Sequence, residues 1–236
     1  MRFPSAYDGV KKLFTSQILS LIATVCSLIA GVAGLVAVSA SLAATYGEEL
    51  GEAELGSMGG AFVGGGIVTI LFGVAAAVLL VIAYILKLVG LKRAGNDEPR
   101  FQQAFLLAIF SLILNVAAVI HRSFGASNGV VDDIVQLFGI VADIIITIMV
   151  IGGIQNLATR MGNQSIVDLG SKLLIIIIIV YVLSFIATLI PVFFGANPGS
   201  AISTGIISVI GLILNIVAFI VFLVYLGKGK NMLKAE

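Results

Sequence analysis

The stretch LLIIIIIVYVLSFIATLIPVFF at residues 173–194 decides the fold class of this chain. It belongs to a run of 55 residues between Lys172 and Lys228 that contains no charged side chain. A helix crosses the hydrocarbon core of a bilayer with about 20 apolar residues, so this run is long enough for two crossings. The segment GANPGS at 195–200 supplies Gly, Asn and Pro, which are typical of a turn between the two helices.

Four further segments are each long enough for one crossing: 13–47, 55–86, 101–121 and 134–159, the last interrupted only by Asp143. We therefore predict an all-α integral membrane bundle of six transmembrane helices. Their expected ranges are 18–44, 61–91, 101–120, 134–155, 173–194 and 202–226. We expect residues 1–236 to form a single multi-pass membrane domain.

The composition excludes several other classes of protein. The chain has 236 residues, of which 60% are hydrophobic and 11% charged, and its mean hydropathy of +1.19 rules out a water-soluble globule. A formal net charge of +1 provides no basic excess for nucleic-acid binding. A lone Cys26 and a lone His121 cannot build a disulfide scaffold or a common zinc site. We find no catalytic motif and expect neither an enzyme nor a cofactor.

Basic residues gather on one side of the predicted membrane. Twelve of the 13 Lys and Arg residues fall there, while the opposite side carries Arg122 and an acidic loop with Glu48, Glu49, Glu52 and Glu54. Short cytoplasmic loops retain basic residues, so we expect both termini in the cytoplasm and the protein in the plasma membrane. A cleaved signal peptide over the first helix is the alternative, although its uncharged run exceeds a typical signal-peptide core.

The loops suggest a repeat of helical hairpins. FGASNG at 124–129 resembles FGANPG at 194–199, and RAGN at 93–96 resembles RMGN at 160–163. These matches predict three tandem hairpins with a weak internal threefold repeat, at about 10–92, 97–158 and 166–230.

Each predicted helix carries a stripe of small or polar residues at helical spacing. Such residues allow close helix packing in a membrane, so we expect the stripes at helix contacts, and Gly139 and Gly211 at particularly close ones. The stripes are Ser20, Thr24, Ser27, Gly31 and Gly34; Gly66, Ile70, Gly73 and Ala77; Ala104, Ala108, Ser111, Asn115 and Ala118; Asp132, Gln136, Gly139 and Asp143; Tyr181, Ser184, Thr188 and Pro191; and Thr204, Ser208, Gly211 and Asn215.

Asp143 is the strongest candidate for a functional residue. It lies ten residues after Asp133, which at 1.5 Å per residue is about 15 Å and places it near the bilayer midplane. A carboxylate at that depth is costly and often marks an ion or proton path, but hydrogen bonding between helices is the interpretation that we favour. The candidate intramembrane polar site comprises Asp143, Asn115, Asn215, Gln136 and Thr147.

Other acidic residues fit helix starts. We expect Asp132 and Asp133 to cap the fourth helix and Asp97 to cap the third, with Glu98 beside it and Pro99 in its first turn. No metal site is expected among them.

Two functional hypotheses remain open. The first is a non-enzymatic multi-pass protein that serves as a structural or partner-binding membrane subunit, with a membrane or cytoplasmic protein as its partner and the lipid bilayer as its environment. The alternative is a small transporter, permease component or channel that uses the polar helix faces and Asp143. Oligomers are compatible with both.

Overall fold

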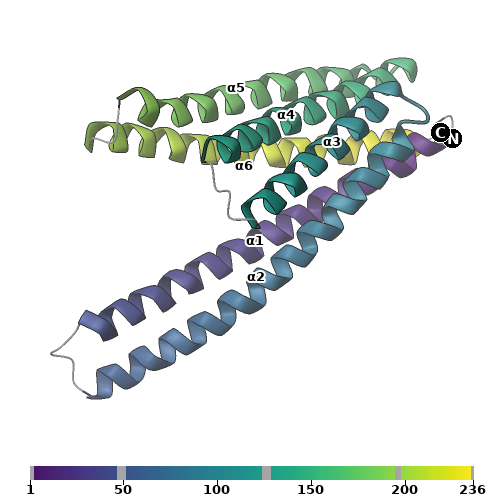
Figure 1. Cartoon of the computed structure of the whole chain (residues 1–236). Coiled ribbons are helices and arrows are strands. Elements are labelled where there is room, and N and C mark those ends of the chain that lie inside the picture. Colours follow the sequence, from purple (N-terminus) through teal and green to yellow (C-terminus); the bar gives the residue numbers. More distant parts are fainter. Residues whose placement is uncertain (1–2, 47–51, 124–128, 195–197, 235–236) are drawn as a thin grey trace. The chain divides into compact units, whose positions relative to one another are not determined.

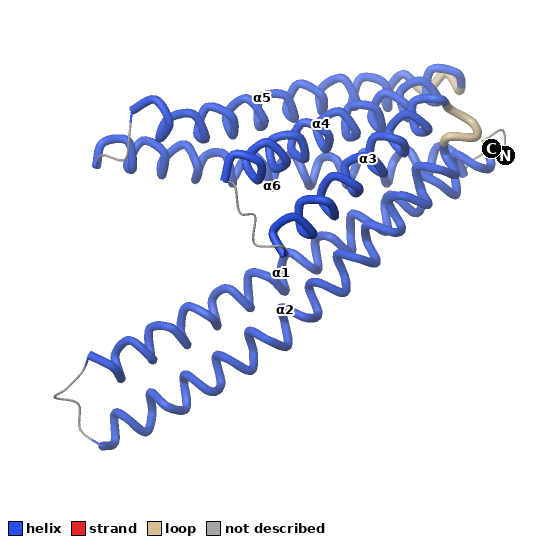
Figure 2. Tube along the Cα trace, in the orientation of Figure 1, coloured by secondary structure: helices blue, strands red, loops and turns tan. Residues whose placement is uncertain are grey.

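The computed structural model describes residues 3–46, 52–123, 129–194 and 198–234, and every element in these ranges is a helix (Figures 1 and 2). The six helices are α1 (Pro4–Tyr46), α2 (Glu52–Ala94), α3 (Pro99–Ser123), α4 (Gly129–Arg160), α5 (Gln164–Phe194) and α6 (Pro198–Lys234). All six contain segments that are long and apolar enough to cross a bilayer. The prediction of an all-α, multi-pass membrane protein with six helices is confirmed.

The helices extend beyond the predicted crossings, most clearly at the start of α1. α1 begins at Pro4, where we expected a start near residue 18, and α6 continues to Lys234. Ala6 and Val10, one helical turn apart in α1, are both fully buried and belong to the main hydrophobic core. The first turns of α1 are therefore packing elements that a search for uncharged runs excludes, since charged residues interrupt them.

The chain divides into two compact units. Unit 1 comprises Met1–Phe14 with Leu88–Glu236, and unit 2 comprises Thr15–Lys87. In unit 1, α3 packs on α4, α4 on α5, and α5 on α6. The core of unit 1 includes the fully buried side chains of Phe101, Ile151, Ile154, Leu157 and Tyr225. The Tyr225 hydroxyl donates to the backbone carbonyl of Ile151 at 3.1 Å, so this buried polar atom has a partner.

Glycines let backbones approach closely within unit 1. A Cβ on Gly9 would stand 2.6 Å from the Gly90 carbonyl oxygen, and a Cβ on Gly90 would stand 2.9 Å from the Gly9 carbonyl oxygen. On α4, a Cβ on Gly153 would stand 2.7 Å from the Phe101 ring. A larger side chain at any of these positions would force the helices apart.

Unit 2 is an antiparallel pair of helical segments joined by alanines at seven-residue spacing. On α1 the residues Ser16, Ala23, Ala30 and Ala37 are buried, and on α2 the residues Ala76 and Ala83 are buried. The Ser16 hydroxyl donates to the Ala83 carbonyl at 2.7 Å, and the Thr69 hydroxyl donates to the Ala30 carbonyl at 3.2 Å. A strict seven-residue repeat of small residues permits close packing, as in a left-handed coiled coil.

Most of the predicted stripe residues of α1 and α2 lie outside this contact, although a Cβ on Gly34 would stand 3.5 Å from the Thr69 hydroxyl. Thr24, Ser27 and Gly31 are exposed, and a Cβ added to Gly66 or Gly73 would meet no atom within 4 Å. The expectation was wrong because it favoured hydroxyl and glycine residues over a longer alanine repeat on the neighbouring face. On α3 the prediction was better, since Ala104, Ala108 and Ala118 are buried.

Gly139 of α4 also departs from the expectation of a close contact. A Cβ added there would meet no atom within 4 Å, so the position is open. The surroundings of the corresponding Gly211 of α6 are not described, so the expectation of a close contact there stays a prediction.

The threefold repeat is not confirmed, and the two similar loops have different backbones. After α4, Gly162 has a φ of 71°, the Asn163 amide donates to the Ala158 carbonyl, and the Gly162 amide donates to the Thr159 carbonyl. This pattern is the Schellman motif that commonly ends helices. After α2, the Gly95 amide donates to the Leu91 carbonyl and Gly95 keeps a negative φ. The loops FGASNG and FGANPG lie largely outside the described residues.

Candidate functional site

Asp143, the leading candidate from the sequence, is exposed on α4 within a segment that is apolar enough to span a membrane. The Thr147 hydroxyl donates to the backbone carbonyl of Asp143 at 2.7 Å. The carboxylate lies near enough to Tyr181 of α5 for an electrostatic interaction with its hydroxyl. Asp143 therefore faces the outside of the described chain beside the α4 and α5 contact.

The other predicted members of this polar site are not gathered around Asp143 by the described contacts. Asn115 is exposed on α3, and its side-chain amide donates to the Ser111 carbonyl of the same helix at 2.8 Å. The side chains of Gln136 and Asn215 lie outside the described residues. The helix-to-helix hydrogen bonds expected for the set therefore stay a prediction.

The best-defined polar cluster lies at the basic end of unit 1, where α3 begins and α4 ends. The Glu98 side chain is 2% exposed, and its Oε2 lies 3.1 Å from Nη2 of Arg160. The Asn156 amide donates to Oε1 of Glu98 at 3.0 Å. Asn156 and Arg160 are four residues apart, so α4 presents both side chains on one face. A carboxylate this deeply buried requires such partners.

Asp97 caps a different helix from the one that we predicted. α3 begins at Pro99, and the Asp97 carboxylate instead accepts a hydrogen bond from the Ala6 amide of α1 at 2.6 Å. The amides in the first turn of a helix have no partner within that helix, so an acceptor from a distant segment stabilises the start of α1. The two residues are 91 positions apart in the sequence, which explains why local spacing does not reveal the contact.

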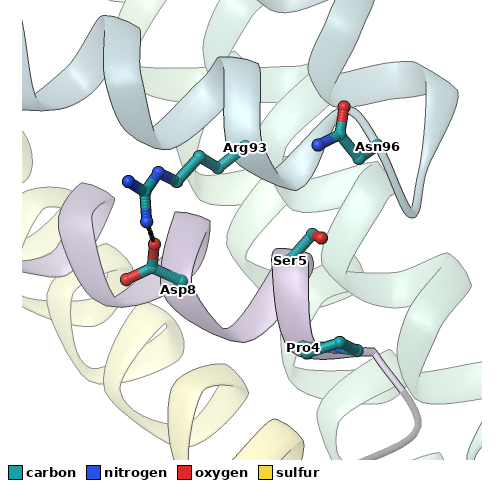
Figure 3. A pocket seen from close by; sticks show the side chains of 5 residues that line it. All are labelled: Pro4, Ser5, Asp8, Arg93 and Asn96. Carbon is teal, nitrogen blue, oxygen red and sulfur yellow. Dashed lines mark hydrogen bonds and ion pairs between the residues drawn. The ribbon is translucent and has the colours of Figure 1, made fainter.

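A cavity of about 380 Å³ opens next to this capping contact, and Figure 3 shows the side chains that line it. Ser5 and Asp8 come from the first turns of α1, and Arg93 and Asn96 come from the end of α2 and the loop after it. Asp8 forms an ion pair with Arg93 and a longer one with Lys12, whose Nζ lies 3.7 Å from Oδ2. The cavity thus contains both a carboxylate and a guanidinium.

The described part of the chain contains no group of three His, Cys, Asp or Glu side chains arranged to hold a metal ion. The side chains of the acidic loop around Glu48 and of the predicted caps Asp132 and Asp133 lie outside the described residues.

No family model matches this chain, and neither a curated protein nor a solved structure is similar enough to count as a match.

Proposed function

We propose that this protein is a non-enzymatic membrane subunit that binds a transmembrane helix of a partner protein through one face of unit 2. The observation that carries the proposal is the separation of two small-residue faces in this hairpin. One face is buried by the alanine repeat, and the other is only partly covered, with Ser27 exposed and Ser20, Gly66 and Gly73 half-buried.

Two hydrogen bonds between α1 and α2 fix the register of unit 2. This register identifies the residues that lie on the second small-residue face. Ser16 pairs with Ala83 and Ala30 pairs with Thr69, so the two segments run antiparallel and the seven-residue positions oppose each other. A residue four positions after a contact residue is rotated by about 40° around the helix axis. Because the two helices run in opposite directions, the residues four positions after the contact residues lie on the same side of the pair in both helices.

Most side chains on that shared side are small or hydroxylated, although Leu80, four positions after the buried Ala76, is bulky and 48% exposed. α1 contributes Ser20, Ser27 and Gly34, where an added Cβ would stand 3.5 Å from the Thr69 hydroxyl, and α2 contributes Gly66 and Gly73, where it would meet no atom within 4 Å. We call these five residues the small-residue face. Thr24 and Gly31 continue it outward on α1, and the Thr24 hydroxyl is already bonded to the Ser20 carbonyl at 2.9 Å. The opposite side of α1 carries bulky apolar residues such as Val25 and Val32, which are 49% and 63% exposed.

This asymmetry favours a helix partner over lipid on the small-residue face. Lipid tails contact bulky apolar side chains such as Leu, Ile and Val favourably. Small residues instead let a third helix approach closely and gain van der Waals contact. The bulky side is suited to lipid. The proposal therefore assigns the two sides of the hairpin to different neighbours.

Bulky substitutions test the proposed face. Ser27→Leu and Gly73→Leu should reduce the amount of complex that is recovered from native membranes in a mild detergent, measured by size on a native gel. Val25→Leu adds volume on the opposite side and is the matched control, which should leave the complex intact. Equal recovery for all three variants would contradict the proposal.

A transporter is the second candidate, and the exposed carboxylate of Asp143 supports it. Its side chain faces outward within a spanning segment of α4, beside Tyr181. Ionisable residues in such positions often contact water or a transported ion. We further propose that both termini are cytoplasmic and that the membrane is the plasma membrane, because the basic residues cluster at the helix ends nearest the termini.

A further inference from the structure

The cavity at the basic end of unit 1 has a lining of mixed charge. Asp8 and Arg93 contribute the two charges, and Ser5 and Asn96 add a hydroxyl and an amide. Figure 3 shows Arg93 reaching from α2 toward Asp8 on the facing turn of α1. About half of the Arg93 side chain remains exposed in spite of this ion pair, so its remaining N–H groups are accessible.

The neighbouring acidic residues Asp97 and Glu98 already have partners other than the residues that line the cavity. Asp97 accepts the Ala6 amide, and Glu98 is enclosed by Asn156 and Arg160. A ligand in the cavity would therefore meet the carboxylate of Asp8 and the guanidinium of Arg93 as its principal charged groups. Lys12 adds a second cation at 3.7 Å from Asp8.

A ligand that carries both charges suits this lining better than a simple anion or cation. A phosphate could accept from Arg93 and from the Asn96 amide, since the guanidinium geometry matches phosphate oxygens. A primary ammonium has three N–H donors, which Asp8 and the Ser5 hydroxyl could accept. Such a ligand would replace one intramolecular ion pair by two intermolecular ones.

The depth of the cavity indicates where this ligand resides. The uncharged run of α1 begins after Lys12 and that of α2 ends before Lys87, so the cavity lies just beyond the ends of both apolar segments, among the charged residues. Phospholipid headgroups occupy that zone of a membrane. We propose that this cavity binds the phosphoethanolamine headgroup of a phospholipid, with the phosphate on Arg93 and the ammonium on Asp8. This proposal does not depend on the partner-binding function.

The test uses the purified full-length protein in detergent micelles, with lipid binding measured by native mass spectrometry. The four probes are dioleoyl phosphatidylethanolamine, dioleoyl phosphatidylcholine, dioleoyl phosphatidylglycerol and soluble phosphoethanolamine. The choline headgroup has the same phosphate but no N–H donor. We expect phosphatidylethanolamine to bind about tenfold more tightly than phosphatidylcholine, as one charge-assisted hydrogen bond would give.

Three variants test which residue binds the phosphate and which binds the ammonium of the headgroup. Asp8→Asn should abolish the preference for ethanolamine over choline, and Arg93→Gln should weaken the binding of both lipids. Asp168→Asn, which removes an exposed carboxylate that accepts from Gln164, is the control and should change neither. If Arg93→Gln does not fold, Arg93→Lys keeps a cation and should retain the ethanolamine preference.

The probes also distinguish a membrane lipid from the soluble headgroup as the ligand. Weak binding of soluble phosphoethanolamine, with the same dependence on Asp8, supports the headgroup assignment, while the lipid should bind more tightly through its tails. Equal binding of ethanolamine and choline lipids would overturn the proposal. So would a preference for phosphatidylglycerol that survives Asp8→Asn, because it would indicate a general attraction of anions to the basic end.

Discussion

Gly65 of α2 lies directly against the backbone of Ala33 of α1, and a Cβ on Gly65 would stand 2.8 Å from the Ala33 carbonyl oxygen. The next residue, Gly66, has open space at the same position. These two neighbouring glycines therefore provide a matched pair for testing the packing of unit 2.

We expect Gly65→Ala to lower the free energy of unfolding by about 1 to 3 kcal/mol, because a backbone oxygen cannot move away as a flexible side chain can. Gly66→Ala should be neutral or stabilising by up to about 1 kcal/mol, since alanine favours a helix more than glycine does. Thermal unfolding in the same detergent would compare the two. Equal destabilisation by both substitutions would show that the hairpin packs through another face.

Because the carboxylate of Glu98 is buried, we expect substitution of Arg160 to cost more stability than substitution of Glu98. Arg160→Gln leaves a 2% exposed carboxylate without its cation and should cost about 3 kcal/mol. Glu98→Gln removes the charge itself and leaves a half-exposed Arg160, so its cost should be smaller, at about 1 kcal/mol.

A double-mutant cycle checks this asymmetry. The variant with both substitutions should be more stable than Arg160→Gln alone, because no buried charge remains. Additive losses in the double variant would mean that the two side chains do not interact.

Substitution of Asp143 distinguishes a membrane subunit from a transporter. If its role is structural, Asp143→Asn should leave stability and function intact, because an amide keeps hydrogen-bonding capacity. If it carries protons or cations, the same substitution should abolish flux into liposomes without changing thermal stability. We expect the structural outcome. Flux measured with a pH-sensitive dye under an imposed potential, and lost specifically in Asp143→Asn, would contradict it and favour the transporter.

The proposed orientation is tested at the loop after α2. In a Cys26→Ser background, Asn96→Cys should react with a membrane-impermeant thiol reagent in inverted vesicles and not in intact cells. A cysteine at Ser57, near the start of α2, should give the opposite pattern. Labelling of position 96 from the outer face would contradict the assignment of both termini to the cytoplasm.

The number and order of the helices could be predicted because the bilayer imposes a minimum apolar length that uncharged segments reveal directly. Helix ends could not, since Ala6 and Val10 gain their burial from distant core residues. The wrong choice of faces on α1 and α2 has a similar cause. Ser27 and Ala30 are both small, and only the partner helix decides which of them is buried.

The polar contacts at the basic end show a second limit of sequence reasoning. Asp97 and Glu98 are adjacent acidic residues at a helix start, yet one caps α1 and the other is enclosed by α4. Local chemistry indicated that these carboxylates need donors, but which donors they meet depends on packing between segments far apart in the chain. The similar sequences RAGN and RMGN likewise give different turns, since only the second has its glycine at positive φ in a Schellman motif.

The small-residue face is the central claim, and photo-cross-linking in native membranes tests it most directly. A photoreactive amino acid at Ser27 should give a discrete adduct with a second membrane protein, identified by mass spectrometry, whereas the same probe at Val25 should react with lipid. Adducts of equal yield from both positions would contradict the account. So would an adduct at Ser27 that contains only a second copy of this 24.5 kDa chain, since the face would then serve self-association.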